Sequence, residues 1–327
     1  MSREVIIGVD LGASKILSGI GTSDGQILQK TKQLTPHGNA SSVIDLIADN
    51  ILEWIKIAEA QHDSVKGIAV AVPGPVTYPG AVIEDSPNLG WQRVEFKEEL
   101  SRRLGRPVVV DKDTNLAALG EYHFGQDRKY THLLYLTVST GVGGGIIIND
   151  RLYHGWRGGG GEFGHMVIDA SGAECSCGRR GCLEAVASGT AVTKQIEALI
   201  KAGRGQNITA CGCGSAVGAP ELGKAARTGD PEALKLIKEL GQNLGIGIAN
   251  LVHLFNPQIV VIGGGVMIGL GDLLLEPIKE YVGEKAFPLH QRDLIIETTT
   301  LGNDIGLYGC IAAIAHGYKE ICDLGDV

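Results

Sequence analysis

Residues 141–184 constrain the fold of this chain more than any other segment, because they combine a glycine turn, carboxylates, a histidine and three cysteines. Cys175, Cys177 and Cys182 have the spacing C-x-C-x4-C, and His165 precedes them. Three thiolates and one imidazole can fill the four positions of a closed tetrahedral zinc site, which leaves none for water. We therefore expect a structural zinc; the alternatives are three reduced cysteines in a glycine-rich turn, or a disulfide.

Polar side chains flank this metal loop. Glu162, His165 and Glu184 are close enough in the chain for one rigid loop to hold all three. Carboxylates accept hydrogen bonds from sugar hydroxyls, and a metal-bound imidazole can donate its other N–H. The pattern predicts a polyol site, whereas the simpler interpretation of Glu162 and Glu184 is ordinary surface charge.

Composition excludes several classes of function. With 327 residues the chain is long enough for two lobes with separate cores. A net charge of -8 argues against binding to nucleic acids or anionic membranes. We find no signal-peptide pattern and no apolar run of about 18 residues, so we expect no membrane span. Seven cysteines, three of them assigned to a metal, fit a reducing cytoplasm, and we expect a cytoplasmic protein.

Two segments share a pattern of strand, glycine turn and strand. Residues 4–28 predict two or three antiparallel strands, and residues 131–150 repeat the design. In the first, Asp10 ends a strand, and the turn of Gly12, Ser14 and Lys15 offers backbone N–H groups and a hydroxyl to an anion. Asp10 would face a hydrated metal ion. An ordinary hairpin is the alternative for the first turn.

The intervening segment has an α/β rhythm. Apolar residues recur at helical spacing over 41–59 and predict a helix, with Ser41 or Ser42 as the expected cap. Residues 65–76 predict a buried parallel strand that runs into a Pro-Gly-Pro loop. We expect 84–96 to form a surface loop. Residues 107–110 predict a strand and a helix follows from near Asn115, so that Asp113 lies at a helix N-terminus, where a carboxylate can simply be a cap.

The C-terminal half alternates helices and strands. We expect helices over 192–203 and 220–255 with glycine stops, strands over 256–266 and 293–300, and a helix over 306–321. Gly263, Gly264 and Gly265 could let a base or ribose lie against bare backbone, or form only a strand-to-helix turn. Between the first two helices, Cys211 and Cys213 are expected in an insertion loop; a second metal pair is the alternative.

Several motifs carry a family resemblance. GVGGGIIINDRLYHG, followed by GEFGH and CSCGRRGCLE, resembles the ROK family of sugar kinases and sugar-responsive repressors. VDLGASK, VPGPV, DKDTNLAALGE, VIGGGV and LGNDIGLYG occur in family order. The resemblance implies an α/β, two-lobed actin-like ATPase (ribonuclease H-like) fold with a nucleotide and sugar cleft between the lobes. Residues 1–115, completed by helix 305–321, would form the small N-terminal lobe, and 116–304 the large lobe with the zinc-binding loop.

The resemblance also implies roles. The chain would be an ATP-dependent kinase, most like a glucokinase that phosphorylates the 6-hydroxyl of glucose, with Asp113 accepting the proton of that hydroxyl. Sugar contacts would come from Gly74, Asn88, Asn115, Glu162, His165 and Glu184. ATP and Mg²⁺ would lie against Asp10, Gly12, Ser14, Lys15, Thr140, Gly141, Gly143, Gly264 and Gly265. The partners would be glucose or a related hexose, ATP and a second copy in a homodimer, with no nucleic acid and no membrane.

Two departures from the family pattern bear on function. Lys112 stands where the family usually has Asn, which leaves open a kinase for an N-acetylhexosamine, mannose or fructose. Ala13 and Ser14 replace the usual Gly and Thr of the first turn, and alanine would strain a position that needs positive φ. The other class of function is a sugar-sensing repressor. Such repressors carry a DNA-binding domain ahead of the core, whereas here the first turn follows Asp10, so we expect none.

Overall fold

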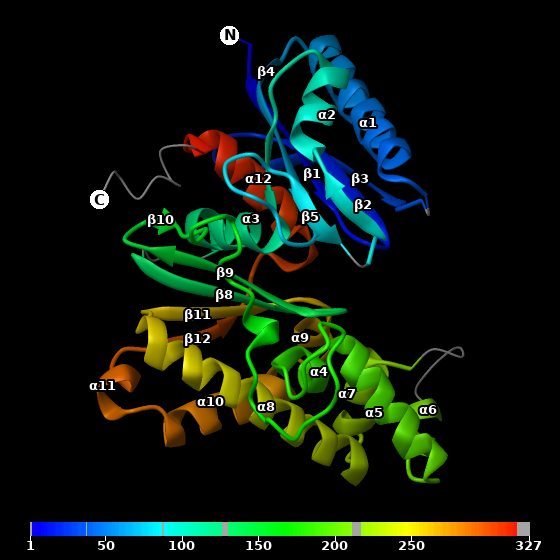
Figure 1. Ribbon diagram of the computed structural model, residues 1–327, viewed down its shortest axis with the longest axis vertical. Helices are drawn as coiled ribbons and strands as arrows, with labels where there is room; N and C mark the ends of the chain where they lie inside the picture. Colours follow the sequence, from blue (N-terminus) through cyan, green and yellow to red (C-terminus); the bar gives the residue numbers. More distant parts are fainter. Residues whose placement is uncertain (1, 37, 87, 126–129, 211–216, 319–327) are drawn as a thin grey trace. The chain divides into compact units, whose positions relative to one another are not determined.

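The computed structural model describes residues 2–36, 38–86, 88–125, 130–210 and 217–318. The chain divides into two compact units. The first comprises Met1–Thr131, Gly145–Gly161 and Asn303–Val327, and the second comprises His132–Gly144 and Glu162–Gly302. Two five-stranded sheets and the helices packed on them form the α/β architecture that the sequence predicts (Figure 1).

The first sheet has the strand order β3-β2-β1-β4-β7. Its strands are β1 (Glu4–Leu11), β2 (Lys15–Gly21), β3 (Ile27–Leu34), β4 (Ser64–Val72) and β7 (Val109–Lys112). Strands β1, β2 and β3 pair antiparallel in succession, whereas β4 lies parallel to both β1 and β7. The predicted N-terminal hairpins and the predicted parallel strand are therefore confirmed.

Alternation along β1 explains why helices cover both faces of this sheet (Figure 1). The odd-numbered residues from Val5 to Leu11 are buried in one core with α1 (Ala40–Ala60). Gly8 faces the other way, where an added Cβ would lie 2.9 Å from the Cβ of Cys310 in α12 (Ile305–Ala315). Strand side chains point alternately to opposite faces, so one strand supports two layers of helix.

Two local predictions for this unit were wrong. The cap of α1 is Asn39, whose side chain accepts from the N–H of Ser42 at 2.9 Å, because a side chain at N-cap reaches the N–H three residues on. The expected loop 84–96 instead contains β5 (Ile83–Ser86) and β6 (Trp91–Val94), paired antiparallel, followed by α2 (Phe96–Leu104). Ile83 and Trp91 are buried, and their burial holds the hairpin in place.

Helix α3 (Asp113–Gly120) begins two residues before the expected start and continues as a π-helical turn, η1 (Glu121–Gly125). Its glycine allows close packing on α12: a Cβ at Gly120 would lie 2.9 Å from the backbone nitrogen of Gly309. Asp113 is therefore the first residue of a helix that is held in place by its packing on α12.

The second sheet has the strand order β10-β9-β8-β11-β12. Its strands are β8 (His132–Val138), β9 (Val142–Ile148), β10 (Arg151–Leu152), β11 (Ile259–Gly263) and β12 (Ile295–Thr298). Counted in the order in which its strands occur along the chain, each sheet reads 3-2-1-4-5. The repeated strand and turn pattern of the sequence thus corresponds to a repeated topology.

Helices make up most of the second unit. They are η2 (Phe163–His165), α4 (Leu183–Ala187), α5 (Gly189–Lys201), α6 (Gln206–Ala210), α7 (Ala219–Arg227), α8 (Pro231–Phe255), α9 (Gly265–Leu270), α10 (Asp272–Lys285) and α11 (Pro288–Gln291). A further 3-10 turn, η3 (Gly302–Asp304), precedes α12. No helix in the described part of the chain is both long and apolar enough to span a bilayer. Cys211 and Cys213 lie outside the described residues.

Glycines inside α8 do not stop this helix, contrary to expectation. Gly241 and Gly245 face α10, where added Cβ atoms would lie 2.5 Å from the Cβ of Pro277 and 2.6 Å from the Cβ of Tyr281. Close packing between the two helices therefore outweighs the low helix propensity of glycine.

Candidate functional site

The second unit brings the four predicted metal ligands together. His165 ends η2, and Cys182 is the N-cap of α4. The Sγ of Cys175 lies 3.7 Å from Nδ1 of His165, and the Sγ atoms of Cys177 and Cys182 are 3.7 Å apart. All four candidate ligand atoms lie within 4.8 Å of one another. Three sulfurs and one imidazole nitrogen at this spacing fit a tetrahedral zinc ion.

Glycine geometry and local charge support this arrangement. Gly181 has a φ of 71°, and a Cβ there would lie 1.5 Å from the carbonyl oxygen of Asp169, so no other residue fits this turn. Hydrogen bonds from the backbone and side chain of Arg179 lower the pKa of the Cys177 thiol to about 6. Burial raises the pKa of the Cys182 thiol to about 12, and a bound cation would oppose that effect by stabilising the thiolate.

The metal loop is connected to the glycine turn between β8 and β9. Cys182 is the N-cap of α4, and two residues later the Oε2 atom of Glu184 accepts a hydrogen bond from the backbone N–H of Val142 at 2.9 Å. Ser176, inside the cysteine loop, donates to the other carboxylate oxygen at 3.5 Å. A Cβ at Gly141 would lie 2.4 Å from Oε2, so this glycine is needed for the contact. Glu162 is exposed and directly precedes η2.

Further contacts fix this turn at the ends of β8 and β11. The N–H of Gly189 donates to the carbonyl of Ser139 at 2.6 Å, and the hydroxyl of Thr190 donates to the carbonyl of Thr140 at 2.9 Å. Gly264 has a φ of 94°, and a Cβ there would lie 2.3 Å from the carbonyl oxygen of Val138. Thr140, Gly141 and Gly264 therefore lie near the same strand ends, with Gly265 opening α9 and Gly143 within β9.

In the first unit the predicted phosphate turn is closed by its own backbone. The N–H of Gly12 donates to the carbonyl of Lys15 at 2.9 Å, and the hydroxyl of Thr35 donates to the carbonyl of Gly12 at 2.7 Å. Ser14 is exposed, and Ala13 is not among the residues with positive φ. Alanine at position 13 therefore causes no backbone strain.

Asp10 and Asp113 form an acidic pair in the first unit. Asp10 is in β1, and a Cβ at Gly306 would lie 2.4 Å from its Cγ, so α12 packs directly on it. Burial, followed by the charge of Asp113, raises the pKa of Asp10 to about 7, while Lys15 acts in the opposite direction. A partly desolvated carboxylate beside a second carboxylate is a favourable position for a divalent cation.

The other sequence-predicted residues of this unit have different surroundings. Gly74 has a φ of 99°, and a Cβ there would lie 2.5 Å from the carbonyl oxygen of Asp85, so the turn after β4 requires glycine. Asn88 is exposed between β5 and β6. Asn115 is buried, and its amide donates to Oδ1 of Asp111 at 3.0 Å.

The sequence did not indicate a buried polar cluster around Asp111. The Oδ2 atom of Asp111 lies 2.8 Å from Nε2 of His154 and 2.7 Å from the hydroxyl of Tyr318. Burial acts to raise the pKa of Asp111, but hydrogen bonds from His154, Tyr318 and Asn115 outweigh it and lower the pKa below its ordinary value. No spacing in the chain links these positions, so no sequence signal could have identified the cluster.

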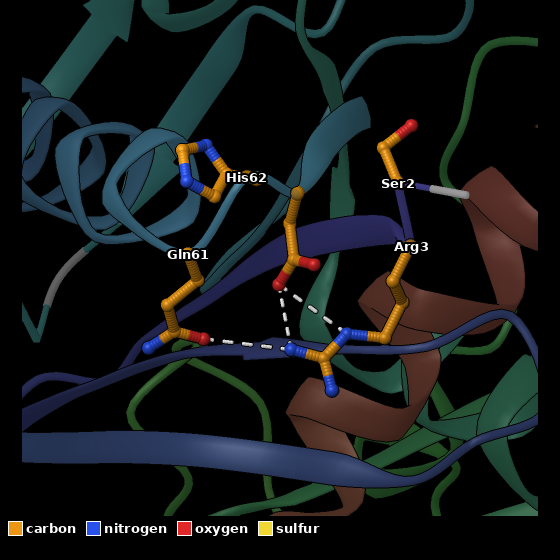
Figure 2. Close-up of a pocket in the computed structure, with 5 residues that line it drawn as sticks. Ser2, Arg3, Gln61 and His62 are labelled. Atoms are coloured by element: carbon orange, nitrogen blue, oxygen red, sulfur yellow. Dashed lines mark hydrogen bonds and ion pairs between the residues drawn. The ribbon is translucent and has the colours of Figure 1, made fainter.

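A surface hollow in the first unit contains none of these residues. Figure 2 shows it lined by Ser2, Arg3, Gln61, His62 and Asp63. The guanidinium of Arg3 donates to Asp63 at 2.6 Å and to Gln61 at 3.4 Å. The charged group of Arg3 thus binds neighbouring side chains of the hollow.

Both sugar kinases and sugar-responsive repressors are similar to this chain. The sequence profile of the ROK family matches residues 6–317. The glucokinase of Thermotoga maritima is 34% identical over 317 residues, which cover 96% of this chain and 98% of that protein. The xylose repressor of Caldicellulosiruptor bescii is 32% identical over 310 residues, covering 94% of this chain and 77% of the repressor. The crystal structure of a ROK family glucokinase from Streptomyces griseus in complex with glucose and AMPPNP matches with a TM-score of 0.84 and 32% identity, covering 96% of this chain and 100% of that one.

Proposed function

The chain belongs to the ROK family, and from that premise we propose that it is an ATP-dependent kinase acting on the 6-hydroxyl of glucose. One observation carries the proposal: Asp113 is the first residue of α3, directly after the end of β7. Phosphoryl transfer to an alcohol needs a base for the hydroxyl proton and cationic stabilisation of the phosphates. Asp113 at the start of α3 and Asp10 in β1 would provide positions for both.

In the first unit Asp113 would accept the hydroxyl proton, and Asp10 would hold the cation. Mg²⁺, when bound, would neutralise charge that develops on the phosphates. The turn of Gly12, Ser14 and Lys15 would bind phosphate oxygens through exposed polar groups. Gly74, Asn88 and Asn115 would contribute to sugar binding. Asn115 would be held for this role by the hydrogen bond from its amide to Asp111.

In the second unit Glu162, His165 and Glu184 would bind sugar hydroxyls. Thr140, Gly141 and Gly143 would bind phosphates, and Gly264 and Gly265 would lie against adenosine. Zinc would hold His165 in one orientation and fix the start of α4, which carries Glu184. We further propose that the enzyme is a cytoplasmic homodimer.

The second candidate is a sugar-sensing regulator without catalytic activity. It is supported by the xylose repressor of Caldicellulosiruptor bescii, whose 32% identity is close to the 34% of the Thermotoga maritima glucokinase. The aspartate at position 113, where the kinase chemistry needs a base, favours the enzyme.

The deciding experiment is ATP-dependent phosphorylation of glucose, mannose, fructose, N-acetylglucosamine and N-acetylmannosamine by the purified full chain. We expect the highest kcat/KM for glucose. If the chain phosphorylates another hexose of the panel best, it is a kinase with a different substrate. Turnover of none, with glucose binding intact by calorimetry, would favour the regulator; DNA binding with a steep dependence on salt would then support it.

A further inference from the structure

The loop of residues 153–161 connects β10 to Glu162. Several contacts restrict its conformation. The N–H of Gly160 donates to the carbonyl of His154 at 2.8 Å, which closes the loop on itself. The N–H of Tyr78 donates to the carbonyl of Arg157 at 3.2 Å. Gly158 has a φ of 91°, and a Cβ there would lie 2.1 Å from the carbonyl oxygen of Val76. The loop is therefore packed tightly on the turn that follows β4.

Two consecutive residues at the end of β7 hold the same loop. Asp111 binds the ring of His154, which is 5% exposed and stacks on Tyr78 with ring centroids 4.0 Å apart. Lys112 donates from Nζ to the carbonyl of Gly160 at 2.7 Å. The two bonds therefore hold the first and last parts of the loop, which the bond between Gly160 and His154 joins.

The burial of Lys112 indicates that its bond is specific. Only 4% of this residue is exposed, and a buried ammonium is unfavourable unless hydrogen bonds and nearby charge compensate for lost hydration. Along the chain Lys112 stands between Asp111 and Asp113. The carbonyl that it binds belongs to Gly160, two residues before Glu162.

We propose that Lys112 is a positioning residue that determines sugar affinity and selectivity by fixing the Gly160 carbonyl, and with it the backbone that leads into Glu162. This inference rests on the proposed kinase function, in which Glu162 binds the sugar. Lys112 itself transfers no proton in the reaction. Its loss should weaken sugar binding while the transfer step and ATP binding stay nearly unchanged.

The test compares K112M, which keeps the length of the side chain but removes the donor, with K56M, the same change at an exposed position of α1. Hydrogen exchange of residues 153–162, measured by mass spectrometry, reports on the loop without any substrate. We expect exchange about tenfold faster in K112M, since one lost charge-assisted hydrogen bond accounts for such a factor, and no change in K56M. K112N serves as a second variant if K112M does not fold.

Kinetics on the hexose panel provides the second readout. We expect the KM for the preferred hexose to rise about tenfold in K112M, with kcat within about threefold and the KM for ATP unchanged, and the order of preference among hexoses to change. Unchanged exchange, or faster exchange with unchanged sugar KM and preference, would overturn the proposal. If the wild-type chain phosphorylates no hexose, the proposed function fails, and calorimetric glucose affinity of K112M then decides the role of Lys112 by the same criterion.

Discussion

The carboxylate of Glu184 accepts the backbone N–H of Val142 at 2.9 Å, across 42 residues of chain. Glu184 belongs to the short helix α4, whose N-cap is Cys182, and Val142 opens β9 immediately after the glycine turn. The contact gives the metal loop a direct connection to the turn that we propose binds phosphates. Glu184, which is predicted to bind sugar hydroxyls, therefore also fixes the backbone at the start of β9.

The first prediction concerns this contact. Glu184→Ala removes the acceptor, whereas Glu184→Gln keeps an oxygen that can accept the same N–H. We expect amide exchange at Val142 to be about tenfold or more faster in Glu184→Ala and at an intermediate rate in Glu184→Gln, because hydrogen bonds to charged groups contribute about 1.5–3 kcal/mol and those to neutral groups about 0.5–1.5 kcal/mol. Exchange measured by NMR checks this. Glu174→Ala, in the exposed part of the same loop, is the control, and equal exchange in all variants would contradict the contact's importance.

The second prediction concerns Asp113. Asp113→Ala should lower kcat by about 100-fold or more, with a small change in the KM for sugar, because removal of a positioned base affects the transfer step. Steady-state kinetics checks it, with Asp85→Ala on the exposed face of β5 as the matched control. Turnover of Asp113→Ala within about tenfold of the wild type would eliminate the proposed mechanism.

The third prediction is a pH dependence of stability. The pKa of Asp10 is raised from 3.8 to about 7, chiefly by burial. The folded state therefore disfavours the ionised carboxyl, so stability is greatest below the unfolded pKa and decreases as pH rises from about 4 to 7. A shift of this size corresponds to at most about 4 kcal/mol, at about 1.4 kcal/mol per pKa unit.

Thermal unfolding of the wild type and of Asp10→Asn checks this. In the absence of Mg²⁺ the difference in Tm between the variant and the wild type should grow in favour of the variant between pH 4 and 8. Added Mg²⁺ at pH 8 should raise the Tm of the wild type more than that of Asp10→Asn. A difference in Tm that is independent of pH would show that Asp10 titrates normally.

The fourth prediction concerns the metal. Protein purified without chelator should contain about one zinc per chain, measured by elemental analysis, and Cys177→Ser should lose the metal together with thermal stability because metal binding is coupled to folding. Cys310→Ser makes the same chemical change at a buried cysteine outside the cluster and should keep the zinc. Metal-free wild-type protein with full activity would rule out the structural role.

Local patterns predicted most of the secondary structure. Alternating and continuous apolar runs located β1, β4, β8 and β11, and glycines located the turns between strands. The cap of α1 failed for a local reason, whereas two other failures had tertiary causes. The hairpin of β5 and β6 depends on the burial of Ile83 and Trp91, and α8 continues through glycines because α10 packs against them.

The candidate metal site was predictable for the same local reason. Its cysteines lie within one short loop, so their spacing alone restricts where the thiols can be. The residues around Asp111 were not predictable in this way, because His154 and Tyr318 are 43 and 207 residues away along the chain.

The sequence by itself determined the kinds of element, the positions of the glycine turns, the set of candidate metal ligands and the family, because each depends on neighbouring residues or on motifs in a given order. Only the tertiary structure decided which donors meet which acceptors. Glu184 binds Val142, Lys112 binds Gly160, and Asp111 binds His154 and Tyr318. Hydrogen bonds depend on distances of about 3 Å, and only the packing of strands and helices brings such distant residues that close.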